Sequence, residues 1–336
     1  MMWSELNHKT VLITGGTGYF GRKFVSLLTK QYLGVKKVII YSRNELKQYE
    51  MEQEFPVQEY PFLEYVLGDV RDADHLLHIC EGVDIIIHAA ALKQVSTAEV
   101  NPSECIKTNI IGSQNVITAA IAQGVQKLVA ISTDKAVAPI SVYGASKLCA
   151  DKLFIDVNRS NELNKPTTFV VRYGNVMGSH ASVIPHFLSK KNQNKPIPIT
   201  HLDATRFAIT AQDAMNLVLF ALKHAQGGEI FIPKIPSFRV LDLAKAICPD
   251  CKYEVIGLRP GEKIHEEMLT ASDALHTIET DKYFITLPHY KMGQKQAYLS
   301  KYNGRLLTEK EVYCSEKNTH WLSVDELKKL VDELTD

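Results

Sequence analysis

The chain has 336 residues, which is long enough for one large domain or two closely packed domains with a sizeable core. Its 38 Lys and Arg residues balance its 38 Asp and Glu residues, so nothing indicates the basic footprint of a nucleic-acid-binding protein. No apolar run reaches the ~18 residues of a membrane-spanning helix, and the polar residues 1–9 do not form a signal peptide. We therefore expect a cytoplasmic protein with reduced thiols and no membrane insertion.

Cysteine spacing gives little sign of a metal. The six cysteines are scattered, and Cys248 and Cys251 form the only close pair. A zinc site needs a second pair of ligands, and no second pair has the required spacing. We expect a turn with two free thiols there, and no metal.

The N-terminal segment predicts a strand, a glycine turn and a helix. Residues 10–14 are β-branched and apolar, as in a buried strand. Gly15, Gly18 and Gly21 follow, and a helical pattern continues through Leu28. Glycines let the backbone approach a pyrophosphate, and a helix N-terminus offers amides and partial positive charge. This arrangement predicts a dinucleotide-binding site.

The second predicted strand, residues 37–41, is followed by Ser42 and Arg43, with Lys47 one helical turn later. An NAD site commonly has an acid here, which binds the ribose hydroxyls. A hydroxyl and two cations suit a 2′-phosphate, so we expect NADP. The alternative is that Arg43 only pairs with Glu45 or another surface acid.

Two further strands are predicted at residues 64–70 and 83–88. The first ends near Asp69, an acid suited to adenine. The second leads into the small residues 89–91, which would let the chain pass close under a nicotinamide ribose.

A long helix is predicted to start at Asn101-Pro102, since proline is accepted in a first helical turn. Asn109 lies inside it among apolar residues. Because a buried Asn needs hydrogen-bond partners, it either braces the active-site strand or is an oddity of the core.

The stretch richest in chemistry follows a buried strand predicted at residues 127–131. Thr133, Asp134 and Lys135 come directly after it, where open α/β sheets place their ligands. The alternative is that Asp134 caps a turn and Lys135 is a solvated loop charge.

Tyr143 begins a helical pattern through Asp156, and Lys147 is four residues further on, so the two share a helix face. A neighbouring ammonium stabilises phenolate. Tyr143 is therefore a candidate proton acceptor near neutral pH, although such pairs also occur by chance.

After this stretch the alternation of strand and helix fades. A strand at residues 167–172 leads into Tyr173-Gly174-Asn175-Val176, which we interpret as a strand end facing the site. The remaining predicted elements are helices at 182–191 and 211–225, a break at 195–198, a last strand at 228–233, and a final helix with a capping box of Ser323 and Glu326.

These elements predict an α/β fold, with a Rossmann-like doubly wound parallel sheet and a smaller C-terminal α/β domain. We expect residues 1–176 and 205–233 to form an NADP-binding domain. Residues 177–204 and 234–336 would form a substrate-binding domain.

Taken together, the motifs resemble the extended short-chain dehydrogenase/reductase family and, within it, the configuration-inverting UDP-N-acetylglucosamine 4,6-dehydratases. The resemblance runs from Ile13 to about Leu287. The segments that carry it are residues 13–18, 41–47, 88–93, 132–136, 143–147, 171–176, 205–207 and 259–263. The pair Asp134-Lys135 separates this subfamily from sugar epimerases, which lack an elimination acid and base there.

The resemblance implies an internal redox reaction in which NADP is reduced and reoxidised. Tyr143, helped by Lys147, would take the 4-hydroxyl proton while C4 gives up hydride. Lys135 would remove the C5 proton, as a lysine can when its surroundings lower its pKa, and Asp134 would assist loss of the C6 hydroxyl as water. Hydride then returns to C6 and a proton to the opposite face of C5. The product would be UDP-2-acetamido-2,6-dideoxy-β-L-arabino-hex-4-ulose.

The site residues expected from the motifs and the resemblance fall into three groups. The candidate catalytic residues are Asp134, Lys135, Tyr143, Lys147 and Thr133. The candidate cofactor-binding residues are Gly15, Thr17, Gly18, Tyr19, Phe20, Gly21, Ser42, Arg43, Lys47, Asp69, Val70, Ala89, Ala90, Ala91, Lys93, Asn109, Tyr143, Lys147, Tyr173 and Val176. The candidate substrate-binding residues are Lys93, Lys135, Asn175, Ser179, Val183, Thr200, Arg206, Arg259 and Glu262.

Several alternatives stay open. A related enzyme could make, reduce or epimerise a 5,6-ene, and a UDP-sugar 4-epimerase or a non-catalytic NADP-sensing protein could share the fold. The resemblance also suggests a UDP-N-acetylhexosamine substrate, a role in pseudaminic acid or other surface-polysaccharide synthesis, and a homo-oligomer, dimer or hexamer. Its packing helices would lie at residues 101–124 and 143–160.

Overall fold

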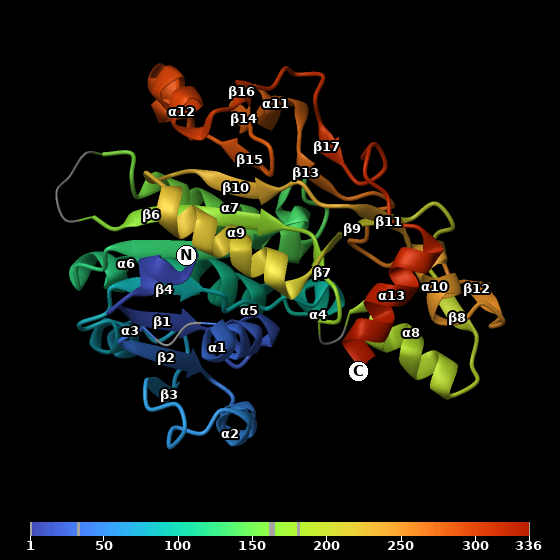
Figure 1. Ribbon diagram of the computed structural model, residues 1–336, viewed down its shortest axis with the longest axis horizontal. Helices are drawn as coiled ribbons and strands as arrows, with labels where there is room; N and C mark the ends of the chain where they lie inside the picture. Colours follow the sequence, from blue (N-terminus) through green and yellow to red (C-terminus); the bar gives the residue numbers. More distant parts are fainter. Residues whose placement is uncertain (1, 32–33, 161–164, 180–181, 336) are drawn as a thin grey trace.

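Figure 1 shows the computed structural model, which describes residues 2–31, 34–160, 165–179 and 182–335. A 10-stranded sheet forms its centre. The strands of this sheet are β1 (Thr10–Thr14), β2 (Lys37–Ser42), β3 (Leu63–Leu67), β4 (Ile85–His88), β5 (Lys127–Thr133), β6 (Thr167–Tyr173), β10 (Ile230–Pro233), β14 (Thr277–Glu279), β15 (Tyr283–Thr286) and β16 (Arg305–Leu306).

The strand order is β16-β14-β15-β10-β6-β5-β4-β1-β2-β3. The strands from β10 to β3 in this order pair in parallel, while β15, β14 and β16 add an antiparallel edge. This is the doubly wound arrangement, in which ligands bind at the carboxyl ends of the strands where the strand order reverses. The predicted fold class is confirmed.

Helices cover both faces of the sheet (Figure 1). They are η1 (Met2–Leu6), α1 (Tyr19–Gln31), α2 (Glu45–Glu54), α3 (Ala73–Ile79), α4 (Val95–Val100), α5 (Pro102–Ile106), η2 (Lys107–Ile111), α6 (Gly112–Ala122), η3 (Asp134–Ala136), α7 (Val142–Asp156), α8 (Val183–Asn192), α9 (Ala211–His224), α10 (Val240–Ile247), α11 (Ala271–Ala274), η4 (His289–Gln294), α12 (Lys295–Tyr302) and α13 (Val324–Thr335). Helices α1 and α9 pack together on one face, and α3, α6 and α7 on the other. The central strands are therefore largely buried, as β1 illustrates, whose five residues are all buried.

A smaller apolar core lies beside the carboxyl ends of the strands, where α8, α10 and α13 gather in Figure 1. Its centre includes Phe187, Ile197, Phe238 and Leu243, all buried. The short strands of this region and its surroundings form three small sheets: β11 (Ser237–Arg239) with β9 (Thr205–Ile209) and β7 (Asn175–Val176), β12 (Tyr253–Val255) with β8 (Ile197–Ile199), and β13 (Glu267–Leu269) with β17 (Tyr313–Cys314). The division into cofactor and substrate domains stays a prediction. Strands β14, β15 and β16 come from the stretch assigned to the substrate domain but join the main sheet.

Several local expectations need correction. The break predicted at residues 195–198 contains β8, and residues 228–233 are not the last strand. These short strands pair with segments distant in the chain, so local periodicity does not reveal them. The long helix from Pro102 is divided by a π-helical turn, η2. The capping box of the final helix is confirmed, because Ser323 and Glu326 exchange side-chain and backbone hydrogen bonds.

The expectation of two free thiols at Cys248 and Cys251 is also wrong, because they form a disulfide. Helix α10 ends at Ile247, and the turn that follows brings the two Cα atoms to 5.4 Å, within bonding range. None of the helices in the described ranges combines the length and apolar character needed to cross a membrane.

Candidate active site

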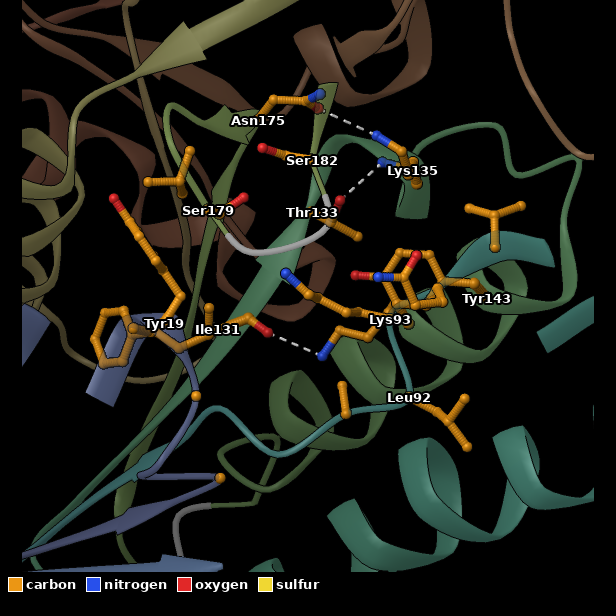
Figure 2. A pocket seen from close by; sticks show the side chains of 18 of the residues that line it. Tyr19, Leu92, Lys93, Ile131, Thr133, Lys135, Tyr143, Asn175, Ser179 and Ser182 are labelled. Atoms are coloured by element: carbon orange, nitrogen blue, oxygen red, sulfur yellow. Dashed lines mark hydrogen bonds between the residues drawn. The ribbon is translucent and has the colours of Figure 1, made fainter. Parts of the chain in front are cut away.

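A cavity of about 1140 Å³ opens at the carboxyl ends of β1, β4, β5 and β6, beside the smaller core. Sites for a single small ligand commonly measure about 300–1,000 Å³, so this cavity is at least as large as such a site. The predicted site residues line it, except Gly21, Asn109 and Asp134. Figure 2 shows several of them converging from different elements.

The glycine turn forms one wall of the cavity. Gly15 has a φ of +66°, and a Cβ there would lie 2.7 Å from the Cα of Ala90. A Cβ on Gly21 would overlap the carbonyl oxygen of Gly16, so Gly21 acts behind the wall by letting α1 approach the turn. The N-terminus of α1 at Tyr19 therefore faces the cavity with exposed backbone amides.

The end of β2 carries the residues expected to select the cofactor. The Ser42 hydroxyl oxygen accepts hydrogen bonds from Thr17 (3.1 Å) and Gln48 (3.2 Å), which leaves its own proton free to donate. The Arg43 side chain is 55% exposed, and its guanidinium lies 3.8 Å from the carboxylate of Asp69.

The Asp69 carboxylate interacts more strongly with Arg71 than with Arg43. Arg71 donates to its carboxylate at 2.6 Å. Burial raises the pKa of Asp69, but the hydrogen bonds and charge of Arg71, with that of Arg43, bring it below its usual range. Arg43 thus pairs loosely with a surface acid, and its guanidinium stays on the cavity wall.

Helix α7 supplies Tyr143 and Lys147 to the centre of the cavity. The helix is capped by Ser141, whose hydroxyl accepts from the Gly144 amide at 3.1 Å. The Lys147 ammonium donates to the carbonyl oxygen of Ile131 at 2.8 Å (Figure 2). Burial lowers the pKa of Lys147.

The expectation that the Lys147 ammonium lowers the pKa of Tyr143 is wrong. Burial raises the pKa of the Tyr143 phenol to about 12, although the charge of Lys135 and a hydrogen bond with Thr133 oppose the rise. The Lys147 ammonium is directed to a backbone carbonyl, so Lys135 is the cation that acts on the phenol.

Lys135 joins four polar groups at the other side of the cavity. Its ammonium lies 3.0 Å from Asp134 Oδ1, 3.2 Å from Glu266 Oε1 and 3.4 Å from Asn175 Oδ1. The Thr133 hydroxyl donates to the same oxygen of Asp134 at 2.9 Å. Asp134 is fully buried behind Thr133 and Lys135, which do line the cavity.

The pKa shifts of Asp134 and Lys135 differ from those expected of a simple acid and base pair. Burial raises the pKa of Asp134, while the charge of Lys135 and the hydrogen bonds of Lys135 and Thr133 oppose the rise. Burial lowers the pKa of Lys135, but the carboxylates of Asp134 and Glu266 outweigh it and leave that pKa above its usual value. The lysine predicted as a base is thus an ammonium in the resting site.

The far end of the cavity is polar, and hydrogen bonds hold its side chains in place. Arg206 donates to Glu262 at 2.9 Å and to the carbonyl oxygens of Thr205 (2.7 Å) and Ile264 (2.9 Å). Thr200 donates to the same Glu262 oxygen at 3.0 Å. Arg259 lies beside this group on the cavity wall.

Asn109 braces the site from behind. Its side chain accepts from the Leu92 amide at 2.7 Å and donates to the Leu92 carbonyl at 3.1 Å and to Ser146 at 2.9 Å. It sits in the π-helical turn η2, a deformation common near functional sites. Asn109 therefore braces the loop after β4 against helix α7, and not the active-site strand itself. Its contact with the cofactor stays a prediction.

Sequence reasoning missed Glu266. It is buried, lines the cavity and contacts Lys135. It lies far from Lys135 in the chain and belongs to no periodic pattern. The available signal was its position just after the segment 259–263, which the resemblance had already included.

A doubly wound parallel sheet, a glycine turn after β1 and a Tyr-Lys pair on helix α7 define an extended short-chain dehydrogenase/reductase. Residues 11–288 match the family described as polysaccharide biosynthesis protein, and the chain belongs to this family.

Named relatives agree with this membership. The chain is 45% identical to the UDP-N-acetylglucosamine 4,6-dehydratase (inverting) of Campylobacter jejuni subsp. jejuni serotype O:2, over 97% of this chain and 98% of that protein. It is 38% identical to a UDP-glucose 4-epimerase of Rickettsia canadensis, over 96% and 95% of the two chains. The X-ray structure of Pen from Bacillus thuringiensis superposes with a TM-score of 0.87 at 36% identity, covering 98% of this chain and 99% of that one.

Proposed function

We propose that the chain is a UDP-N-acetylglucosamine 4,6-dehydratase of the inverting type that works with NADP. The observation that carries this proposal is the pair Asp134-Lys135 at the cavity, beside the Tyr143 phenol. The similarity to the Campylobacter jejuni enzyme supports the same reaction.

The cavity fits a nicotinamide dinucleotide. Its backbone cradle at Gly15 leaves no room for a Cβ, and the N-terminus of α1 offers amides to a pyrophosphate. Ser42, Arg43 and Lys47 line the same end and suit a 2′-phosphate, which favours NADP over NAD. When bound, the cofactor supplies a hydride acceptor for C4 and a hydride donor for C6.

The side chains of the protein then donate and accept the protons of the reaction. Tyr143 accepts the 4-hydroxyl proton as the C4–H bond breaks, and the resulting ketone acidifies C5. Lys135 first releases the proton of its ammonium to solvent and then accepts the C5 proton as a free amine. The C6 hydroxyl leaves as water with a proton that originates on Asp134. Thr133 connects Asp134 to the cavity. When Asp134 is protonated, the hydrogen bond between them runs from the carboxyl to the Thr133 hydroxyl, which can then donate its own proton to the leaving group. Hydrogen returns to C6 as hydride and to C5 as a proton, and the net change is loss of water.

The polar end of the cavity suits the nucleotide sugar. Arg206 and Arg259 match a diphosphate, because guanidinium groups bind phosphate oxygens in paired hydrogen bonds. Thr200 and Glu262 offer a hydroxyl and a carboxylate for the uridine or its ribose.

A second candidate is a UDP-sugar 4-epimerase, which the similarity to the Rickettsia canadensis protein favours. Such an enzyme needs the oxidation at C4 but no elimination of water. The Asp134-Lys135 pair would then have no chemical task.

One assay separates the two candidates. We expect purified protein incubated with UDP-N-acetylglucosamine and NADP to form a 4-keto-6-deoxy product, lighter by one water. Lys135→Ala should lower its rate by about a hundredfold or more, whereas Lys152→Ala, an exposed lysine on α7, should not. A 4-epimer of unchanged mass would favour the epimerase, and an undiminished rate in Lys135→Ala would remove Lys135 from the mechanism.

A homo-oligomer, either dimer or hexamer, and a role in surface-glycan synthesis such as that of pseudaminic acid remain parts of this proposal. Both are drawn from the family resemblance.

A further inference from the structure

Glu266 is a buried carboxylate on the wall of the cavity, and the reaction described above gives it no task. Its side chain is 2% exposed, and its Oε1 lies 3.2 Å from the Lys135 ammonium. The other oxygen, Oε2, has no hydrogen-bond partner among the described residues. A buried carboxylate with an unsatisfied oxygen is costly, so the contact with Lys135 requires an explanation.

The backbone holds Glu266 in place independently of Lys135. Its amide donates to the Ser315 hydroxyl at 2.9 Å, and its carbonyl accepts from the Ser315 amide at 2.8 Å. Ser315 is itself hydrogen-bonded to Thr205 at 2.7 Å, next to Arg206. The carboxylate is thus directed at Lys135 by fixed structure.

The charges around Lys135 and Glu266 show how Glu266 affects the Lys135 amine. The groups that face Lys135 or Glu266 are Asp134 on η3, Tyr143 on α7, Arg206 on β9, Lys263 before β13 and, through Arg206, Glu262. With Asp134 protonated, Lys135, Arg206 and Lys263 carry three positive charges against the two negative charges of Glu262 and Glu266. Removing the charge of Glu266 increases this positive excess, which favours loss of a proton from Lys135.

We propose that Glu266 is a positioning residue that holds the proton on the Lys135 amine and so sets the pH range in which this amine exchanges protons with the sugar. The two carboxylates beside Lys135 then have separate tasks. Asp134 stores the proton for the leaving hydroxyl, and Glu266 stays ionised beside the amine. The role in catalysis rests on the proposed dehydratase function, whereas the effect on the charge of Lys135 does not.

The first test needs no substrate. Wild-type protein and the variants Glu266→Gln, Glu266→Asp and Glu267→Gln are labelled briefly with acetic anhydride near pH 8, and acetylation of Lys135 is measured by mass spectrometry. Only the free amine reacts, so we expect Glu266→Gln to label about tenfold faster or more. Glu267 is the neighbouring residue and is not in contact with Lys135, so its variant should label like wild type. Labelling of Glu266→Gln at the wild-type rate or slower would overturn the proposal.

Glu266→Asp keeps the test decisive if Glu266→Gln does not fold. Aspartate keeps the charge but withdraws it by about one bond length, so labelling of Lys135 should fall between wild type and the Gln variant. Labelling equal to wild type, in the absence of folded Glu266→Gln, would contradict the proposal.

The second test asks whether the charge matters for catalysis. The rate at which C5 of the sugar exchanges hydrogen with solvent is measured as a function of pH. We expect the rise of this rate with pH to begin about one pH unit or more lower in Glu266→Gln than in wild type. A purely structural role would lower the rate at every pH without moving the profile, and superimposable profiles would refute the catalytic role. Absence of any exchange in wild type would instead count against the dehydratase function and leave the labelling result valid.

Discussion

Arg43 is the residue on which the choice of cofactor depends most directly. Its guanidinium is largely exposed at the cavity and only loosely paired with Asp69, at 3.8 Å. A charge-assisted hydrogen bond to a phosphate contributes about 1.5–3 kcal/mol. The loose pairing therefore leaves Arg43 able to bind a 2′-phosphate.

We predict that Arg43→Ala weakens NADP binding by about tenfold to a hundredfold and leaves NAD binding nearly unchanged. Calorimetric titration with each dinucleotide measures both effects. Arg159→Ala is the matched control, because Arg159 pairs with Asp156 on the surface and does not line the cavity. Equal losses for NADP and NAD in Arg43→Ala would show that Arg43 does not read the 2′-phosphate.

Residues near one another in the chain were predictable, and those joined by folding were not. Thr133, Asp134 and Lys135 follow one strand, so their shared place at its carboxyl end follows from the doubly wound fold. Glu266 reaches Lys135 only because β13 pairs with β17 and Ser315 fixes its backbone. The charge of Lys135 depends on that long-range contact, which the local sequence does not reveal.

At the scale of elements, Asn109 connects the loop after β4 to helix α7. Three of its side-chain hydrogen bonds reach the backbone of Leu92 and the hydroxyl of Ser146. Leu92 precedes Lys93 on the cavity wall, and Ser146 precedes Lys147. Loss of this brace should therefore affect stability and cofactor binding together.

Asn109→Ala should lower the free energy of unfolding by about 1–3 kcal/mol, because the partner groups lose their hydrogen bonds. It should also weaken NADP binding, although Asn109 does not line the cavity. Urea unfolding and a binding titration measure the two effects. Asn101→Ala, which removes an exposed hydrogen bond to Thr97, is the control and should alter cofactor affinity little. An Asn109 variant with wild-type stability and affinity would exclude the brace.

For the whole molecule, His88 couples stability to pH. Its Nδ1 accepts from Thr14 at 2.7 Å, and its Nε2 donates to Ser113 at 3.0 Å, an assignment set by the bond that Ser113 donates to the Asn109 carbonyl. Burial, with the charge of Lys147, lowers the pKa of His88 to about 3. The unfolded chain therefore binds a proton at this residue more readily than the folded protein does.

This difference in proton binding sets the direction in which the stability changes with pH. The contribution of His88 to stability is complete above the unfolded pKa of about 6.5 and is lost as the pH falls toward 3. Between pH 7 and pH 5 we expect His88 alone to cost about 2 kcal/mol of unfolding free energy. His88→Gln should be less stable at pH 7 but should lose less stability on acidification. His78→Gln, at an exposed position, should keep the wild-type loss. Urea unfolding at pH 7 and pH 5 measures these losses of unfolding free energy. Equal losses in wild type and His88→Gln would contradict the role of His88 in the pH dependence.

The arrangement of the whole molecule was predictable in part. The parallel half of the sheet follows from buried apolar strands that alternate with helices, and this pattern is local. The antiparallel edge of β15, β14 and β16 was not predicted, because its strands are short and add to a sheet built by residues far earlier in the chain.

The central claim is that oxidation at C4 lets Lys135 and Asp134 remove water from C5 and C6. The most direct measurement is to run the reaction with UDP-N-acetylglucosamine in heavy water, reduce the product at once with borohydride to prevent later exchange, and locate the deuterium by NMR and mass spectrometry. We predict solvent deuterium at C5 and none from solvent at C6, whose new hydrogen comes from C4 of the sugar. A product with no deuterium at C5, or with solvent deuterium at C6, would contradict it.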